Sequence, residues 1–454
     1  MTAAITALNE TVSRILWGPA TLLLFLAVGI LYTVRCGFLQ FFHPRLILKK
    51  TVGSLLDRRR KDGVSPFAAM SAALAGTMGV GNITGIAAAI TLGGAGSVFW
   101  MWVSALIGMM TKYGEVLLAV RYRQKGPEGF FGGPMYYIRQ GTGSKGLAVL
   151  FCIFCISASF GVGNMTQTNA IAQSAKQLWN VPTWLSGLAA ALLIGLVTVG
   201  GIRRISQVTQ WIIPVLSLLY LLFSAVVLFL CRERIPSAFA QILHDAFSPR
   251  CMTGAGVGMG LSRAVRYGFS RGIFSNEAGL GSAPIAHAAA ETEHPAEQGL
   301  WGIFEVFADT IVVCTVTALV ILTSGVGEKG YFGADMTGAA FSLILGQFGG
   351  DLVRFSLLFY AVAAALGWAF YGEQAVRYLF PQHKAAVSLY RFFFLFCCVL
   401  GAVAELELVW AIADTLNGLM ALPNLAAMVL LCPEAARLTK EYLTHYKNTK
   451  KRSP

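Results

Sequence analysis

The sequence predicts an all-α integral membrane protein with about eleven transmembrane helices. Hydrophobic residues make up 56% of the 454 residues and charged residues only 13%, about half the charged share of a typical soluble globular protein. The mean hydropathy is +0.64. The apolar residues also gather in eleven runs, most of them long enough for a helix to cross a bilayer.

The eleven runs differ in length, and two of them are unusual. They cover residues 15–35, 66–92, 97–120, 147–178, 183–200, 207–231, 254–288, 299–323, 351–374, 388–404 and 406–431. The second and seventh are far longer than the about 20 residues of a perpendicular span, and glycine clusters interrupt both. Because lipid offers no hydrogen-bond partner to a loosened backbone, we expect these two helices to be broken where they line a polar cavity.

The positions of the two broken runs predict an internal repeat. They lie five runs apart, which indicates two five-helix halves, residues 63–235 and 236–432, with the second inverted relative to the first. An extra N-terminal helix and a basic loop occupy residues 1–62, and a basic tail occupies residues 433–454. We expect residues 324–350 to form an outer loop with a short helix across the mouth.

The distribution of Lys and Arg predicts the orientation. The net charge of +13 comes largely from alternate loops, which is typical of cytoplasmic loops of membrane proteins rather than of nucleic-acid binding. These basic loops contain Arg45, Lys49, Lys50, Arg58, Arg59, Arg60 and Lys61, then Arg121, Arg123, Lys125, Arg139 and Lys145, then Arg203 and Arg204. We therefore expect a multi-pass protein of the inner (plasma) membrane, with its N-terminus outside and its C-terminus in the cytoplasm. The acidic stretch 291–297 is the exception on the cytoplasmic side.

Several function classes lack their motifs in this sequence. There is no nucleotide-binding loop, nucleophile elbow or two-histidine metal motif. The nine cysteines lie mostly in apolar runs and are expected to pack as small hydrophobic residues. The sequence therefore favours neither an enzyme nor an ATP-driven pump, and it predicts no cofactor.

The first break carries groups suited to binding a charged solute. Unwinding at Gly79 and Gly81 frees the amides of Val80 and Gly81, and bare amides at a helix N-terminus attract a carboxylate. Carbonyls at the end of the preceding helix, near Met78, together with the oxygens of Thr77 and Asn82, suit a hard cation. The alternative is that the glycines form a packing face for a neighbouring helix.

The second break is less sharp. Ser275 or Asn276 is expected to cap the inner half-helix at its start, with Glu277 in the first turn, where an acid is favoured. An ionisable residue at membrane depth indicates function, although Glu277 could equally be a structural partner of a Lys or Arg. Phe274, beside the gap, could form the wall of a small pocket or pack in the core.

Three further runs contain polar or aromatic candidates. Asn164 and Gln167 share a helical face and need either a polar cavity or partner helices. Glu305 and Asp309, four residues apart, could bind a cation, relay a proton or pair with a basic residue. Trp368 lies too far along its run for an obvious position at the membrane interface, although that position remains an alternative.

These segments resemble the alanine/glycine:cation symporter family, also called sodium:alanine symporters. The matching stretches are GTMGVGNITG at Gly76–Gly85, GGPMYYI at Gly132–Ile138, FSNEAGLGSAPIAHAAA at Phe274–Ala290, Glu305–Leu319 and LNGLMALP at Leu416–Pro423. The resemblance implies a LeuT-like 5+5 inverted repeat with one added N-terminal helix. It also implies sodium-driven uptake of alanine, glycine or a similar small neutral amino acid.

The resemblance assigns roles to individual residues. It implies a substrate site made by Thr77, Met78, Gly79, Val80, Gly81, Asn164, Gln167, Phe274 and Trp368, with the carboxylate on the amides of Val80 and Gly81. One sodium site would contain the Thr77 carbonyl and the Asn82 side chain. A second would contain the carbonyls of Ala75 and Met78.

One departure from the family pattern affects the second sodium site. The family usually has a pair of hydroxyl residues before the Gly-Trp of the ninth run, whereas this chain has Ala363, Ala364 and Ala365 there.

The sequence is therefore interpreted as that of a secondary active symporter that works by alternating access and is coupled to sodium. The alternatives are a proton-coupled carrier using Glu277, Glu305 or Asp309, and an amino-acid sensor that does not transport. The sequence leaves the preferred amino acid, the stoichiometry and the oligomeric state open.

Overall fold

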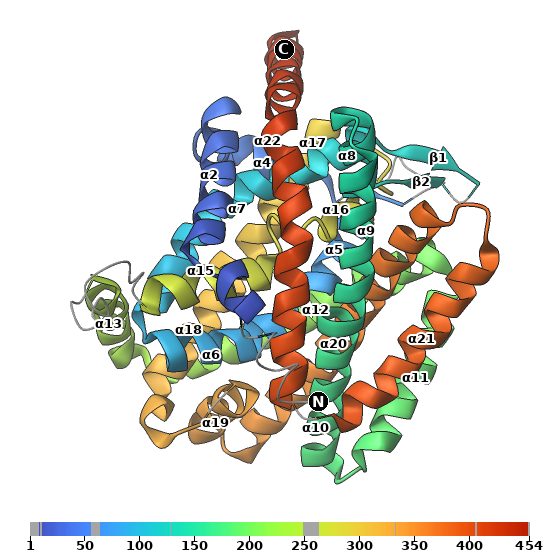
Figure 1. Ribbon diagram of the computed structural model, residues 1–454. Helices are drawn as coiled ribbons and strands as arrows, with labels where there is room; N and C mark the ends of the chain where they lie inside the picture. Colours follow the sequence, from blue (N-terminus) through green and yellow to red (C-terminus); the bar gives the residue numbers. More distant parts are fainter. Residues whose placement is uncertain are drawn as a thin grey trace.

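The computed structural model describes residues 9, 11–55, 64–127, 129–247, 263–331, 333–404 and 406–452. The described residues are mostly helical (Figure 1), as the sequence predicts, with one two-stranded antiparallel hairpin between β1 (Gln124–Gly126) and β2 (Gly129–Phe131). In this hairpin Lys125 pairs with Phe130.

The helices follow one another with short connections. In chain order they are α2 (Pro19–Arg35), α3 (Leu39–Phe42), α4 (Pro44–Lys50), η1 (Val52–Ser54), α5 (Pro66–Thr77), η2 (Gly81–Gly85), α6 (Ile86–Gly93), α7 (Gly96–Arg121), α8 (Pro134–Thr142), α9 (Lys145–Phe160), η3 (Gly161–Met165), α10 (Thr166–Trp179), α11 (Thr183–Thr198), α12 (Gly201–Leu230), η4 (Arg232–Arg234), α13 (Ile235–Phe247), α15 (Arg263–Asn276), α16 (Ala283–His287), α17 (Pro295–Val306), η5 (Phe307–Cys314), α18 (Thr315–Ser324), η6 (Val326–Lys329), α19 (Gly333–Leu345), α20 (Gln347–Leu379), α21 (Lys384–Val403) and α22 (Leu406–Arg452). The elements η2, η3 and η5 are π-helical turns, a form that often marks functional sites.

All eleven predicted runs coincide with helices in the described part of the chain. Eight continuous helices there are long and apolar enough to cross a membrane, and α5 with the helix over Gly81–Gly93 forms a ninth span bent by 51°. The shorter α11 and the interrupted α15–α16 account for the other two runs. Residues 254–262 of the seventh run lie outside the described residues.

Burial separates central helices from peripheral ones. In α7 and α20 most residues of the spanning window are buried, whereas in α12 and α21 only 28% are. Exposed Trp211, Leu218 and Phe392 illustrate the apolar outer faces of these peripheral helices, which suit contact with lipid. The polar residues discussed below therefore belong to helices that lie away from lipid.

The two broken helices lie side by side in opposite directions. The α5 half-helix packs on α16, and the α6 half-helix packs on α15. Val64 and Ala290 form a parallel bridge at the end of the first pair, and the Glu291 amide donates to the Val64 carbonyl over 2.9 Å. This pairing is what an inverted repeat with a discontinuous first helix in each half requires.

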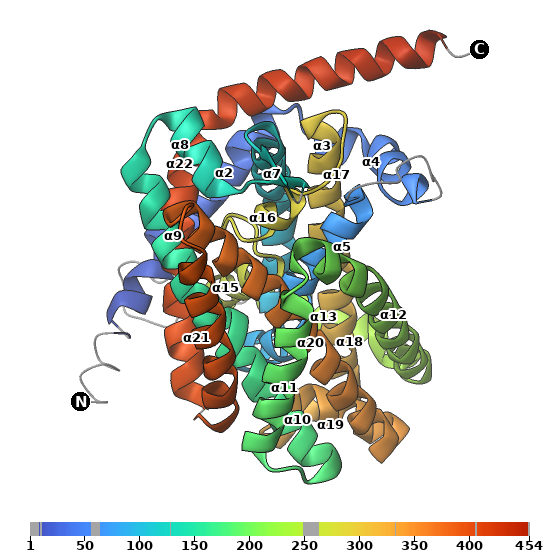
Figure 2. The same ribbon diagram turned by 90° about the vertical axis from the view of Figure 1, so that its right-hand side faces the viewer.

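The connections gather at two opposite ends of the molecule. Figure 2 shows α4, α8 and the last part of α22 at one end, and α19 at the other. The basic residues of α4, α8 and the last part of α22 thus share one end, and α19 is the short helix predicted within residues 324–350. The helix α13 was not predicted, and α22 continues well beyond residue 431, because the polar tail is helical and lies along the surface.

Candidate functional site

The first helix break exposes both ends of the peptide backbone. Helix α5 ends at Thr77, Met78 is extended, and the chain becomes helical again at Gly81. Among the described residues, the carbonyls of residues 75–78 accept no hydrogen bond and the amides of Val80 and Gly81 donate none. The predicted break is therefore present, and it leaves acceptors and donors a few residues apart inside the protein.

The second break lies later in the chain than predicted. Helix α15 continues to Asn276 and the next helix begins at Ala283, with positive φ angles at Glu277, Gly279 and Gly281 between them. The expectation that Ser275 or Asn276 caps an inner half-helix with Glu277 in its first turn is therefore wrong. The glycines allow left-handed conformations that keep the segment non-helical for six residues.

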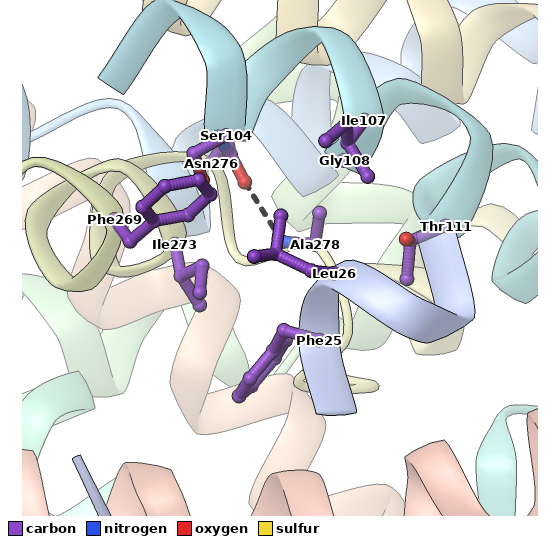
Figure 3. Close-up of a pocket in the computed structure, with 10 residues that line it drawn as sticks. All are labelled: Phe25, Leu26, Ser104, Ile107, Gly108, Thr111, Phe269, Ile273, Asn276 and Ala278. Atoms are coloured by element: carbon purple, nitrogen blue, oxygen red, sulfur yellow. Dashed lines mark hydrogen bonds between the residues drawn. The ribbon is translucent and has the colours of Figure 1, made fainter. Parts of the chain in front are cut away.

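The extra helix α2 packs directly against this second break. Figure 3 shows Phe25 and Leu26 of α2 facing Ala278, whose amide donates to the Asn276 side-chain oxygen over 3.0 Å. A Cβ atom at Gly279 would lie only 2.6 Å from the Phe25 ring. The close contact explains why the segment has a glycine there.

A buried carboxylate that the sequence reasoning missed supports the second break. Glu115 of α7 is fully buried, and its oxygens accept from the Asn424 side-chain amide at 2.6 Å and from the Gly279 amide at 3.1 Å. Asn424 also donates to the Gly279 carbonyl at 3.0 Å and accepts from Tyr137. An acid inside the apolar run 97–120 is itself a signal, and it could have identified Glu115.

The two breaks enclose a small cavity. It is lined by Gly76, Thr77, Gly79, Val80, Gly81, Val162, Gln167, Phe274, Glu277, Trp368 and Asn417. Seven of the residues predicted for the substrate site are in this set. The space between the walls holds about one water molecule, so a bound solute requires the walls to move apart.

Two of the predicted substrate residues do not line the cavity. The Met78 sulfur lies 3.7 Å from the Ser217 hydroxyl of α12. The Asn164 amide donates to the Phe394 carbonyl at 2.6 Å, so it joins helices instead. Asn417, in contrast, lines the cavity although it was not predicted.

Two carboxamides at the cavity have unused hydrogen-bonding capacity. The Gln167 nitrogen donates to the Val162 carbonyl at 3.1 Å, whereas its buried oxygen has no partner. A Cβ atom at Gly79 would lie 3.6 Å from that oxygen, which places it beside the first break. The Asn417 oxygen is also buried without a partner. A buried polar group left unpaired costs about 1–3 kcal/mol, so both groups are suited to a polar ligand.

Next to the cavity, Asp309 of η5 joins the two breaks. Its carboxylate accepts from the Asn82 side-chain amide at 2.7 Å, from the Ser275 hydroxyl at 2.7 Å and from the Thr310 hydroxyl at 2.8 Å. The Asn82 oxygen accepts from the Gly79 amide at 3.1 Å. The carboxylate is thus fully buried with neutral donors around it. Asn82 connects it to Gly79, next to the unpaired carbonyls of the first break.

Glu305, the other acid of the predicted pair, is instead bound by basic residues. Its oxygens lie 3.4 Å from the Lys112 ammonium and 2.9 Å from the His287 ring, and all three residues are fully buried. His287 also contacts the Gln298 amide at 2.8 Å. Among the alternatives stated for Glu305, the contacts match the structural pairing.

An alanine of α20 lies beside the predicted second cation site. A Cβ atom at Gly79 would lie 3.6 Å from the Ala364 methyl and 3.7 Å from the Tyr360 carbonyl. The Tyr360 hydroxyl donates to Ser217 at 3.2 Å. The alanines of α20 therefore offer no hydroxyl to a cation near the carbonyls of Ala75 and Met78.

An ion pair lies one helical turn from the cavity. The Arg271 guanidinium contacts both oxygens of Asp414, at 3.2 and 3.5 Å, and lies 5.5 Å from the centre of the Phe274 ring. Asp414 precedes Asn417 by three residues on α22. The pair thus joins the half-helix α15 to α22 beside the cavity wall.

Comparison with known proteins identifies the family. The sodium:alanine symporter family matches residues 2–454. The chain belongs to this family. It is 41% identical over 454 residues to the sodium/alanine symporter AgcS of Methanococcus maripaludis, covering 98% of this chain and 99% of the relative. It is also 42% identical over 449 residues to an uncharacterized transporter of Haemophilus influenzae, covering 98% and 97%.

The solved structures agree with this assignment at the level of the fold. MhsT in complex with L-phenylalanine superposes with a TM-score of 0.57 at 14% identity, over 84% of this chain and 99% of MhsT. The LeuT-like fold is therefore confirmed. The protein described here is therefore a multi-pass, sodium-coupled amino-acid symporter and not an enzyme.

Proposed function

We propose that this symporter imports small neutral amino acids such as alanine and glycine, together with sodium, by alternating access. The observation that carries the proposal is the first break, where unpaired carbonyls and amides meet in one enclosed cavity. A zwitterion presents a carboxylate and an ammonium to match them. The cavity is small and is lined by the large rings of Phe274 and Trp368, which favours a small side chain.

The charged ends of the substrate have separate partners in this proposal. The carboxylate binds the amides of Val80 and Gly81, at the start of the outer half-helix, where the helix dipole favours an anion. The ammonium binds the free carbonyls of α5 and the unpaired Gln167 oxygen. Each contact uses a group that has no protein partner in the described structure.

The proposed sodium site lies between the two breaks. The oxygens of Asp309, Ser275 and Asn82, with the Thr77 carbonyl, form a set of hard ligands around a buried carboxylate. Asn82 would turn its oxygen from the Gly79 amide toward the cation. Because α20 carries Ala363, Ala364 and Ala365 where the family pattern has hydroxyl residues, we propose a single sodium ion per cycle at this site.

Transport follows from motion of the broken helices about the bound solutes. On one side the Arg271–Asp414 pair closes the cavity, and on the other side the pairing of Val64 with Ala290 holds the inner half-helices together. Because cytoplasmic loops carry an excess of Lys and Arg, the proposal takes the basic end with the C-terminus as cytoplasmic and the Arg271 side as outer. Opening either contact exposes the cavity to one side of the inner membrane.

Purified protein in liposomes tests this function. Labelled alanine and glycine are offered with an inward sodium gradient, and separately with an inward proton gradient at constant sodium. We expect accumulation with the sodium gradient only. Accumulation driven by protons alone would establish the proton-coupled alternative. Binding without counterflow would establish a sensor.

A further inference from the structure

The role of Asn417 is not explained by binding the main chain of an amino acid. Asn417 is 1% exposed and lies on α22, beyond the two repeat-starting helices that carry the unpaired backbone groups. Its side-chain oxygen is fully buried and has no hydrogen-bond partner among the described residues. An amide oxygen is a hydrogen-bond acceptor, and a donor on a bound ligand would offset the free-energy cost of burying it unpaired.

The position of Asn417 assigns it to the side-chain end of the cavity. The first half of α22 packs against η3, which contributes Val162 to the cavity wall. Arg271 pairs with Asp414, three residues before Asn417, and lies 5.5 Å from the centre of the Phe274 ring, so this part of α22 lies close to Phe274. Trp368 also lines the cavity. Asn417 is therefore a polar group set among apolar walls, whereas the main-chain charges of a substrate find their partners at residues 75–81 and Gln167.

The other polar group on this part of the lining is already engaged. Glu277 accepts a hydrogen bond from Ser282, so its carboxylate is partly satisfied within the second break. Asn417 has no such contact. Its oxygen can accept a hydrogen bond from a hydroxyl group of a ligand.

We propose that Asn417 is a specificity-determining residue that selects amino acids with a small hydroxyl side chain, serine above alanine and glycine. The inference rests on the proposed function, since it takes the cavity as the amino-acid site. A serine hydroxyl adds a single oxygen to alanine, which suits a cavity whose walls leave little space. An alanine or glycine in the same site leaves the buried Asn417 amide unpaired, which lowers its affinity.

Competition against labelled alanine uptake tests the proposal without any variant. Unlabelled serine, alanine, glycine and threonine are titrated against sodium-driven alanine uptake in proteoliposomes. We expect serine to inhibit at about a tenfold lower concentration than alanine, as one net hydrogen bond allows. Inhibition by serine at the same or a higher concentration than alanine would overturn the proposal.

Substitution then tests the residue itself. Asn417→Leu and the smaller Asn417→Ala should reduce the serine-to-alanine affinity ratio about tenfold, mainly through weaker serine binding. The matched control is Asn169→Leu, because Asn169 is equally buried but donates to the carbonyls of Gly401 and Ala404 and does not line the cavity. It should leave the ratio unchanged.

Two further outcomes separate the inferences. An equal loss of serine and alanine affinity in the Asn417 variants would mean that Asn417 binds the ammonium, which overturns the selectivity proposal. Sodium-driven alanine uptake without serine preference would refute this inference alone. Absence of sodium-driven uptake of either amino acid would refute the proposed function.

Discussion

Addition of one methyl group at Gly81 tests the location of the substrate site. Gly81 lies at the start of the outer half-helix and lines the cavity. A Cβ atom there would meet the Ser275 backbone at 3.4 Å and the Phe274 ring at 3.5 Å, both ordinary contacts. The Gly81→Ala protein should therefore fold, because the methyl group occupies space that the empty protein can spare.

The expected magnitude follows from the size of the cavity. Its walls leave space for about one water molecule, and the new methyl group takes part of the volume that the substrate must share. Overpacking by one methyl group costs about 1–3 kcal/mol, and each 1.4 kcal/mol is tenfold in affinity. We expect the alanine affinity of Gly81→Ala to fall by roughly 5- to 100-fold, with glycine affected less because it lacks the competing methyl group.

The assay is equilibrium binding of labelled alanine and glycine to detergent-solubilised protein at saturating sodium, with thermal unfolding measured on the same samples. The matched control is Gly85→Ala, four residues further along. A Cβ atom at Gly85 meets nothing within 4 Å, so this variant should retain alanine affinity. Unchanged affinity in a folded Gly81→Ala protein would refute the substrate site.

The remaining predictions concern the cation site, the buried ion pair and the second break. Asp309→Asn keeps the shape but removes the charge, so the sodium concentration for half-maximal alanine binding should rise at least about tenfold; an unchanged sodium titration would contradict the site. Glu305→Gln leaves Lys112 buried without its carboxylate, which should cost about 3–5 kcal/mol and appear as a large drop in thermal stability; a stable variant would contradict the structural role. Gly279→Ala must keep a φ of +93° beside Phe25, so it should lower the melting temperature. The control Gly338→Ala, whose Cβ meets nothing within 4 Å, should not lower it. Equal melting temperatures for the two variants would contradict this account of the break.

The sequence was sufficient to predict the membrane fold and the first break. Apolar run length sets the number of spans, and Gly79 and Gly81 weaken the helix where no lipid can repair it. The cavity residues Gln167, Phe274 and Trp368 followed from the resemblance to the family. These signals are local, because a helix and its break depend on residues that are close along the chain.

Contacts between distant segments could not be predicted in this way. The division of roles between Glu305 and Asp309 is an example: only packing places Lys112 and His287 on one acid and Asn82 and Ser275 on the other. A side chain that is polar on an apolar helix signals a need for a partner but does not identify it.

The sequence by itself determined that this chain is a bundle of apolar helices with a weakened backbone near residue 80, because hydrophobic length and glycine placement are properties of the chain alone. The tertiary structure decided that Asn164 joins helices while Asn417 faces the cavity, and that Glu115 supports the second break. Those outcomes depend on which helices meet inside the membrane, where every buried polar group must find its partner across segments hundreds of residues apart.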